Sequence, residues 1–216
     1  MNLLIQYFKS SVPAREQEYL VCLNENVKNR FIQKIHVFLE YNVEPPLDHP
    51  KIEYVDFNKR CTYDDFFNYS RKNLNGQNCI VSNSDIIFDE TLIHFTDFDL
   101  TKYFICLTRW NITENDGLRY YNEPCSQDCW IFKSPLPEKF VCPLHLGTAG
   151  CDNFVAFCAT KAGLITNNPS LLIKTKHLHL VNHRTYRPED RPRGIAEHLY
   201  PTNSLNIISR KEYREI

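Results

Sequence analysis

Residues 78–89 read NCIVSNSDIIFD, a stretch that changes from apolar to polar and back again. Its apolar start, 79–81, is typical of a strand that is buried on both faces. Asn83, Ser84 and Asp85 follow at the carboxyl end of that strand, which is where open α/β sheets bind their ligands. A carboxylate between two apolar runs is costly to bury unless it has a partner. A divalent metal or a cluster of backbone N–H groups could be that partner, and the alternative is that Asp85 merely caps a turn.

The residues before this stretch predict strands that alternate with helices. We expect strands at 3–5, 35–39, 52–55 and 79–81, and helices at 14–31 and from Thr62 onwards. Thr62 and Asp65 have the spacing of a capping box, which marks the start of the second helix. The resulting order, β-α-β-β-α-β, predicts an α/β fold that binds ligands at the ends of its strands.

The second half of the chain is less regular. We expect strands at 103–107 and 130–132, a helix at 153–161 closed by Gly163, and a last long strand that begins at 171–173. His177 and His179 are two positions apart, so in an extended chain they lie on one face. Segment 182–194 carries four arginines and two prolines. We predict that it is a mobile basic loop that closes as a lid over bound ligand.

The composition excludes several classes of protein. The chain has 216 residues and a net charge of −1. This length suits a single domain over 1–216, and the charge gives no basic field for nucleic acid. The first residues become polar too soon for a signal peptide, and there is no run of about 18 apolar residues, so we expect neither secretion nor a transmembrane segment.

The nine cysteines are irregularly spaced, and several lie inside apolar runs. This pattern predicts buried, reduced thiols in a cytoplasmic protein. A zinc site formed by Cys125, Cys129, Cys142 and Cys151 is a weaker alternative, because the chain contains no paired Cys-x-x-Cys motif.

A series of short segments, in this order, resembles the GT-A glycosyltransferases. They are 83–89 (NSDIIFD), 107–110 (LTRW), 126–132 (SQDCWIF), 150–153 (GCDN), 168–170 (NPS) and 177–179 (HLH). The series runs over nearly the whole chain and is most similar to the N-terminal glycosyltransferase domain of a large chlorovirus-encoded protein. Many GT-A enzymes carry Asp-x-Asp, whereas only the third position of the triplet Asn83-Ser84-Asp85 is a carboxylate here.

The resemblance implies a single GT-A (Rossmann-like) nucleotide-sugar-binding domain with a central mixed, mainly parallel sheet flanked by helices. It implies a divalent metal, Mn2+ or Mg2+, and transfer of a sugar to a glycan acceptor. The viral relative suggests a UDP-linked hexose or deoxyhexose as donor. It also suggests a role in capsid-glycan synthesis in the host cytoplasm, as part of a longer multidomain chain.

The chemistry of such a transfer suggests roles for particular residues. A departing diphosphate needs a metal to neutralise its charge. Asp85 is the best candidate ligand, and His177 or His179 could complete the site, since imidazole binds metals such as manganese. The expected contacts to the nucleotide sugar are Gln6, Tyr7, Ser10, Arg60, Asn83, Ser84, Asp85, Arg109 and Lys174.

An inverting mechanism also needs a base for the acceptor hydroxyl. The resemblance implies that Asp152 lies where GT-A enzymes place this base. A plain helix N-cap is its alternative role, and a helix N-terminus is expected to lower its pKa. Asp128 is the rival candidate. Trp110 and Trp130 could stack on sugar rings, although large aromatics are more often core residues.

Two other functions remain open from the sequence. One is a metal-dependent hydrolase of nucleotide sugars or phosphoesters, in which Asp85, His177, His179 and Asp152 form one cluster. The other is a non-catalytic nucleotide-binding module. Dependence on an acceptor separates the transferase from the hydrolase, and turnover separates both from the binding module.

Overall fold

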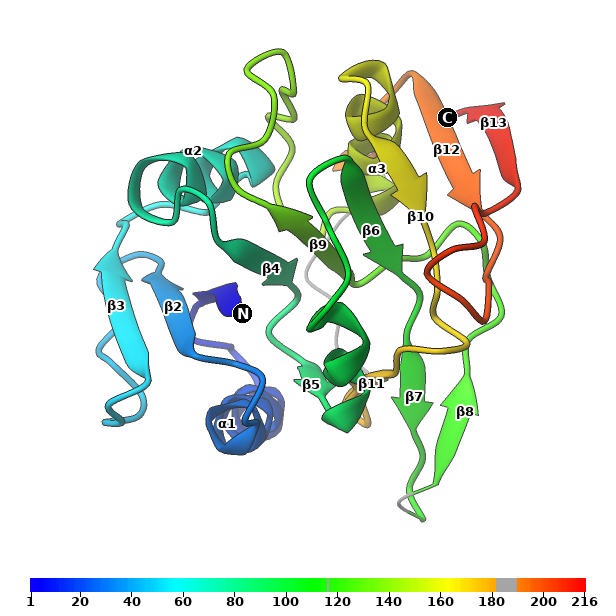
Figure 1. Cartoon of the computed structure of the whole chain (residues 1–216). Coiled ribbons are helices and arrows are strands. Elements are labelled where there is room, and N and C mark those ends of the chain that lie inside the picture. The colour runs from blue at the N-terminus through cyan, green and yellow to red at the C-terminus, as the bar shows by residue number, and fades with distance from the viewer. Residues whose placement is uncertain (116, 182–189) are drawn as a thin grey trace.

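The computed structural model describes residues 1–115, 117–181 and 190–216, and a mixed seven-stranded sheet forms its centre (Figure 1). The strand order is β10-β6-β9-β4-β1-β2-β3. In chain order the strands are β1 (Asn2–Tyr7), β2 (Lys34–Leu39), β3 (Ile52–Asp56), β4 (Asn78–Ser82), β6 (Tyr103–Leu107), β9 (Cys129–Lys133) and β10 (Ile165–Asn167). All neighbouring strands pair in parallel, except that β9 is antiparallel to both of its neighbours, β4 and β6. The expected mixed, mainly parallel sheet is therefore confirmed.

Helices cover both faces of this sheet. Helix α1 (Pro13–Lys28) and the short 3-10 helix η1 (Glu90–Phe95) pack on one face, and α2 (Tyr63–Asn73) and α3 (Cys151–Lys161) pack on the other (Figure 1). Each face has its own apolar core, because alternate side chains of the strands point to opposite sides. The capping box at the start of α2 is confirmed: the Asp65 N–H donates to Thr62 Oγ1, and the Thr62 N–H donates to the Asp65 carboxylate.

A second sheet lies beyond the carboxyl end of β4. Its order is β5 (Ile86–Phe88), β11 (Thr175–His177), β7 (Trp110–Ile112) and β8 (Leu118–Tyr120). Strand β11 is paired on both sides, with His177 opposite Ile86 of β5 and opposite Asn111 of β7. Segments far apart in the sequence are thus brought together at the polar residues that follow β4.

Two expectations about the last third of the chain are wrong. Residues 171–173 form a turn rather than a strand, because the N–H groups of Leu172 and Ile173 both donate to the Pro169 carbonyl, at 3.0 and 2.9 Å. The strand that follows, β11, is short, and it is not the last. A hairpin of β12 (Ile195–Leu199) and β13 (Lys211–Glu215) comes after it.

The expected basic lid falls mainly on residues 182–189, which lie outside the described residues. Its carboxyl end is described, and there Gly194 exchanges two backbone hydrogen bonds with Ile216, at 2.8 and 3.0 Å. Position 194 therefore extends the hairpin. Within the described ranges, no helix is both long and apolar enough to cross a membrane.

Candidate metal and nucleotide site

Polar side chains gather at one edge of the central sheet. Because β9 alone runs against the other strands, its amino end lies at the same edge as the carboxyl ends of β1, β4 and β6. Residues 83–85, Arg109 and Asp128 all adjoin these strand ends. This is the edge at which open α/β sheets bind ligands.

Asp85, His177 and His179 form a group that could hold a metal ion. One potential ligand atom from each lies within 4.8 Å of the other two. Asp85 Oδ2 is 3.1 Å from His177 Nε2 and 3.6 Å from His179 Nδ1. The Leu178 N–H donates to the Asp85 carbonyl at 2.9 Å, which anchors the segment between the two histidines. The structure thus brings the three sequence-predicted ligands together.

Two charged residues of α1, which the sequence did not single out, complete this group. Arg15 donates to the carboxylates of Asp85 and Glu18 and, at 3.0 Å, to the Leu178 carbonyl. Glu18 Oε1 accepts from the N–H groups of Leu180 and Val181, at 2.8 and 3.0 Å. The i, i+3 spacing of Arg15 and Glu18 on α1 was the only feature of the sequence that could have indicated their contact. An amphipathic helix normally turns such charges to solvent, yet Arg15 and Glu18 are only 4% and 7% exposed.

The electrostatics of Asp85 favour its ionised form. Burial raises the pKa of the Asp85 carboxyl, but His177, His179 and Arg15 outweigh burial and hold that pKa well below its ordinary value. Asp85 Oδ1 is buried and has no hydrogen-bond partner among the described residues. Apart from the imidazoles, one guanidinium faces the two carboxylates of Asp85 and Glu18 here, so these three groups carry a net negative charge. A free carboxylate oxygen, two imidazole nitrogens and this charge fit a divalent transition metal.

A second polar cluster surrounds Asp128. Arg109 Nη1 donates to Asp128 Oδ2 at 3.0 Å, and Asn83 Nδ2 donates to Asp128 Oδ1 at 3.0 Å. Arg109 also donates through Nε to Asn111 Oδ1 at 3.0 Å. Asn111 Oδ1 lies 3.1 Å from His177 Nδ1, so a continuous line of polar contacts joins Asp128 to the Asp85 group.

Asp152 lies in the first turn of α3, beside this cluster. The N-cap of α3 is Gly150, with φ 82°, so Asp152 is not the cap. Its Oδ2 accepts from the Gln127 N–H at 3.0 Å. Burial and then the charge of Asp128 raise the pKa of Asp152 to about 7. The expected lowering by the helix N-terminus is therefore wrong, because these two effects outweigh the hydrogen bonds from backbone N–H groups.

The remaining candidate contacts are distributed around the same edge. Gln6, Tyr7 and Ser10 end or follow β1 and are buried, and the Ser84 hydroxyl donates to the Gln6 carbonyl. Gln6 Oε1 is buried and has no hydrogen-bond partner in the part of the chain that the structure describes. Arg60 donates to the Leu146 carbonyl at 3.2 Å, in the loop before α3.

Lys174 lies beside the second sheet, with its Nζ 5.5 Å from the centre of the Trp110 ring. Trp110 itself donates to the Ser170 carbonyl at 2.8 Å. Trp130 is only 1% exposed and packs edge-on against Tyr63, so it is a core residue and cannot stack on a sugar. The other contacts that were expected with the nucleotide sugar remain predictions.

The alternative clusters from the sequence do not form. Within residues 1–115, 117–181 and 190–216, Asp85, His177 and His179 are the only group with metal-ligand spacing. Among these described residues, the four cysteines of the zinc alternative do not form such a group, so that alternative has no geometric support. Asp152 is not part of the metal group, and the four-residue cluster of the hydrolase alternative has no geometric support.

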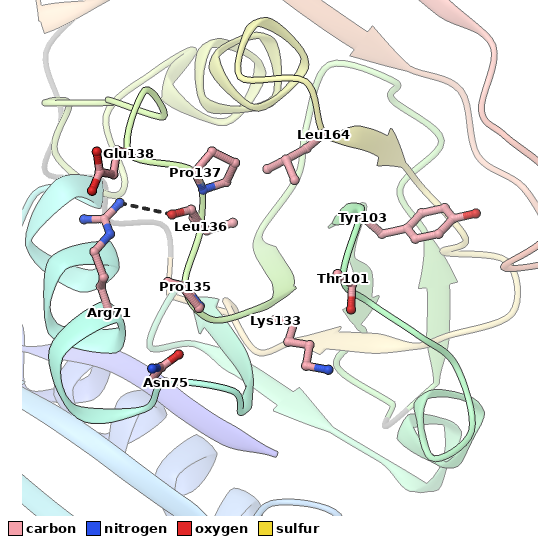
Figure 2. Close-up of a pocket in the computed structure, with 10 residues that line it drawn as sticks. All are labelled: Arg71, Asn75, Thr101, Tyr103, Lys133, Pro135, Leu136, Pro137, Glu138 and Leu164. Atoms are coloured by element: carbon pink, nitrogen blue, oxygen red, sulfur yellow. Dashed lines mark hydrogen bonds between the residues drawn. The ribbon is translucent and has the colours of Figure 1, made fainter.

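Two cavities, of about 460 and 370 Å³, lie at the opposite edge of the sheet. Figure 2 shows the larger one, between the loop at Pro135–Pro137 and the start of β6 at Tyr103. Arg71 donates to the Leu136 carbonyl on its wall, at 3.4 Å (Figure 2). None of the candidate site residues lines either of these two cavities.

Comparison with known proteins supports the fold. No protein-family model matches the chain, and no curated protein sequence matches it. The chain is similar to the solved structure of the mannosyltransferase PcManGT from Pyrobaculum calidifontis in complex with GDP-Man and Mn2+, with a TM-score of 0.55 and 11% identity. The match covers 86% of this chain but only 58% of the mannosyltransferase, so this chain spans less than two thirds of it. The chain therefore has a glycosyltransferase fold of the GT-A type, as expected from the sequence.

A second structure, HddC from Yersinia pseudotuberculosis, matches with 14% identity over 62% of this chain and 74% of HddC. Its TM-score of 0.33 is too low to establish a shared fold.

Proposed function

We propose that this chain is a metal-dependent glycosyltransferase that moves a sugar from a nucleoside diphosphate sugar to a glycan acceptor. The observation that carries the proposal is the group Asp85, His177 and His179 at the carboxyl edge of a GT-A-type sheet. It is supported by Asp152, a carboxyl group near that edge whose pKa is raised to about 7. A group with this pKa can accept a proton at neutral pH, as a general base must.

The finer parts of the proposal rest on the resemblance. We propose residues 1–216 as one catalytic domain, a UDP-linked hexose or deoxyhexose as donor, and a viral capsid glycan as acceptor, made in the host cytoplasm. The mannosyltransferase of similar fold was solved with GDP-Man, so GDP-linked sugars belong in the same test as UDP-linked ones.

The residues of the site have separate roles in the proposed transfer. Asp85, His177 and His179 would hold a divalent metal, which neutralises the charge of the departing diphosphate when it is bound. Asp152 accepts the proton of the acceptor hydroxyl as that oxygen attacks the anomeric carbon, which gives inversion. The Gln127 N–H fixes the orientation of the Asp152 carboxylate. Asp128 raises the pKa of Asp152 through its charge, and its own position is held by Arg109 and Asn83.

Binding of the donor is tested first. Thermal unfolding is followed with UDP, GDP and ADP, each with and without Mn2+. A specific ligand stabilises the fold by mass action, by about 2.7 kcal/mol at a hundred times its dissociation constant. We expect one nucleotide to stabilise the protein only when Mn2+ is present. Equal midpoints under all conditions would contradict a nucleotide-sugar site.

Turnover is tested second. Release of nucleoside diphosphate from matching donor sugars is measured with and without glycan acceptors. A transferase releases it slowly in water and faster with an acceptor, whereas a hydrolase is unaffected by the acceptor. Metal-dependent binding without any turnover would indicate the binding module instead.

A further inference from the structure

Asn111 contacts one of the two ring nitrogens of His177. Asn111 and His177 are register partners on the parallel strands β7 and β11. Side chains at paired positions of adjacent strands project from the same face of the sheet. The two side chains are therefore adjacent because of strand pairing, and Asn111 Oδ1 is 3.1 Å from His177 Nδ1.

Arg109 identifies the atom of Asn111 that faces the histidine. Arg109 Nε is 3.0 Å from the same Asn111 atom, and a guanidinium N–H can only donate. The Asn111 atom must therefore be the carbonyl oxygen, because a flipped amide would point an N–H at an N–H. Arg109 is itself held in place by Asp128 and by Ser126, both at 3.0 Å, so this orientation is fixed from two sides.

The protonation pattern of His177 follows. An oxygen that only accepts requires the facing His177 Nδ1 to carry a hydrogen. In the neutral ring Nε2 then has a free lone pair, and Nε2 points at Asp85 Oδ2, 3.1 Å away. A lone pair and a carboxylate repel each other unless a second ring proton or a metal ion lies between them, and a bound metal would replace that proton. The other tautomer would place a hydrogen on Nε2, which would bond to Asp85 and remove the nitrogen ligand.

We propose that Asn111 is a positioning residue that holds His177 in the Nδ1–H tautomer and so presents Nε2, together with Asp85, to a divalent metal. The proposal rests on the metal dependence proposed above. Metal-binding histidines usually donate their second ring N–H to an oxygen, and loss of that partner typically costs about 10–100-fold in metal affinity. Asn111 supplies the oxygen here, although no sequence motif marks it.

The test compares variants that keep or remove the acceptor oxygen. Asn111→Leu and Asn111→Ala remove it, and Asn111→Asp keeps an oxygen toward both His177 and Arg109. Asn115→Leu makes the matched change at an exposed position between β7 and β8. Thermal unfolding of each variant confirms that it is folded before any other measurement.

Two readouts are used, and neither needs a sugar donor. Nitrogen NMR of the metal-free protein, at a pH where the ring is neutral, assigns the hydrogen of His177 to Nδ1 or Nε2. Electron paramagnetic resonance measures free Mn2+ and gives its dissociation constant without nucleotide. We expect Nδ1–H in the wild-type protein, Asn111→Asp and Asn115→Leu. We expect loss of this preference and about 10–100-fold weaker Mn2+ binding in Asn111→Leu and Asn111→Ala.

The possible outcomes separate this proposal from the proposed function. An Nε2–H ring in the wild-type protein, or folded Asn111→Leu with unchanged tautomer and Mn2+ affinity, would overturn the role of Asn111. An Nδ1–H ring in a wild-type protein that binds no Mn2+ would instead overturn the metal centre on which both proposals rest. Absence of glycosyl transfer, with both readouts as expected, would leave the role of Asn111 standing and remove the proposed reaction.

Discussion

Arg15 on α1 donates a hydrogen bond to the carboxylate of Asp85, and both side chains are almost completely buried. The same guanidinium bonds Glu18, which in turn accepts two N–H groups of the segment after His179. Helix α1 therefore fixes both the carboxylate of the metal group and the segment that carries its histidines. Breaking a buried ion pair leaves an unpaired charge in a medium of low polarity, and this is strongly unfavourable.

Arg15→Met should therefore destabilise the protein. The change keeps most of the apolar stem but leaves Asp85 and Glu18 buried without their cation, so we expect a loss of about 3–5 kcal/mol in the free energy of unfolding, measured in urea. Arg30→Met is the matched control, because Arg30 pairs with Glu90 on the surface and both side chains are about two-thirds exposed or more. Such a pair is worth at most about 1 kcal/mol. Similar losses in the two variants would contradict the role of Arg15.

Asp85→Ala should abolish the metal dependence of nucleotide binding. The change removes the only carboxylate of the metal group, and two imidazoles alone form a poor site for Mn2+. Titration of the preferred nucleoside diphosphate, with and without Mn2+, gives the two affinities. In the wild-type protein Mn2+ should increase affinity, whereas in a folded Asp85→Ala variant the two values should coincide. An unchanged effect of Mn2+ would place the metal elsewhere.

The local features of this fold could be predicted from the sequence, and the contacts of the site could not. The capping box at Thr62 and the strand that ends at Ser82 depend on neighbouring residues, so local reasoning found them. His177 and His179 were found because their spacing places them on one face of a strand. Arg15 and Asn111 were missed, because their importance depends on which distant strands pair with each other.

The difference between local features and contacts of distant segments also explains why the pKa of Asp152 was wrongly expected to be lowered. Its position near a helix N-terminus is visible in the sequence, and that feature alone lowers a pKa. Its burial and its proximity to Asp128 depend on how α3 packs against the loop before β9, and these two effects raise the pKa. Residues 171–173 show a similar limit, since their apolar character suggests a strand although they form a turn in which only Ile173 is buried.

The raised pKa of Asp152 predicts how stability depends on pH. Between its ordinary value of 3.8 and about 7, the folded state binds this proton more tightly than the unfolded chain does. The free energy of unfolding contributed by this group must therefore fall as pH rises through that interval. Asp152→Asn cannot titrate, so it should gain stability relative to the wild-type protein as pH rises from about 4 to about 7, and this gain should level off at higher pH. Asp97→Asn, at an exposed position, serves as the control.

Unfolding in urea at several pH values between 4 and 8 checks this expectation. The stability difference between Asp152→Asn and the wild-type protein should grow with pH, and by more than the difference measured for the exposed Asp97→Asn. A difference for Asp152→Asn that does not change with pH would show that the pKa of Asp152 is not raised.

The raised pKa of Asp152 also predicts that kcat/KM rises with pH to a plateau above about 7, because the base must be deprotonated to act.

Asp152→Asn also tests which carboxylate is the base. The amide keeps the shape of the side chain and can still accept from the Gln127 N–H, so the start of α3 should stay intact. Loss of a general base typically costs about 10²–10⁴-fold in rate, and turnover should fall by that order while nucleotide affinity is unchanged. Asp128→Asn should cost less, because the Asp128 carboxylate already accepts hydrogen bonds from Arg109 and Asn83. If Asp152→Asn keeps near-normal transfer and Asp128→Asn abolishes it, Asp128 is the base and Asp152 has the supporting role.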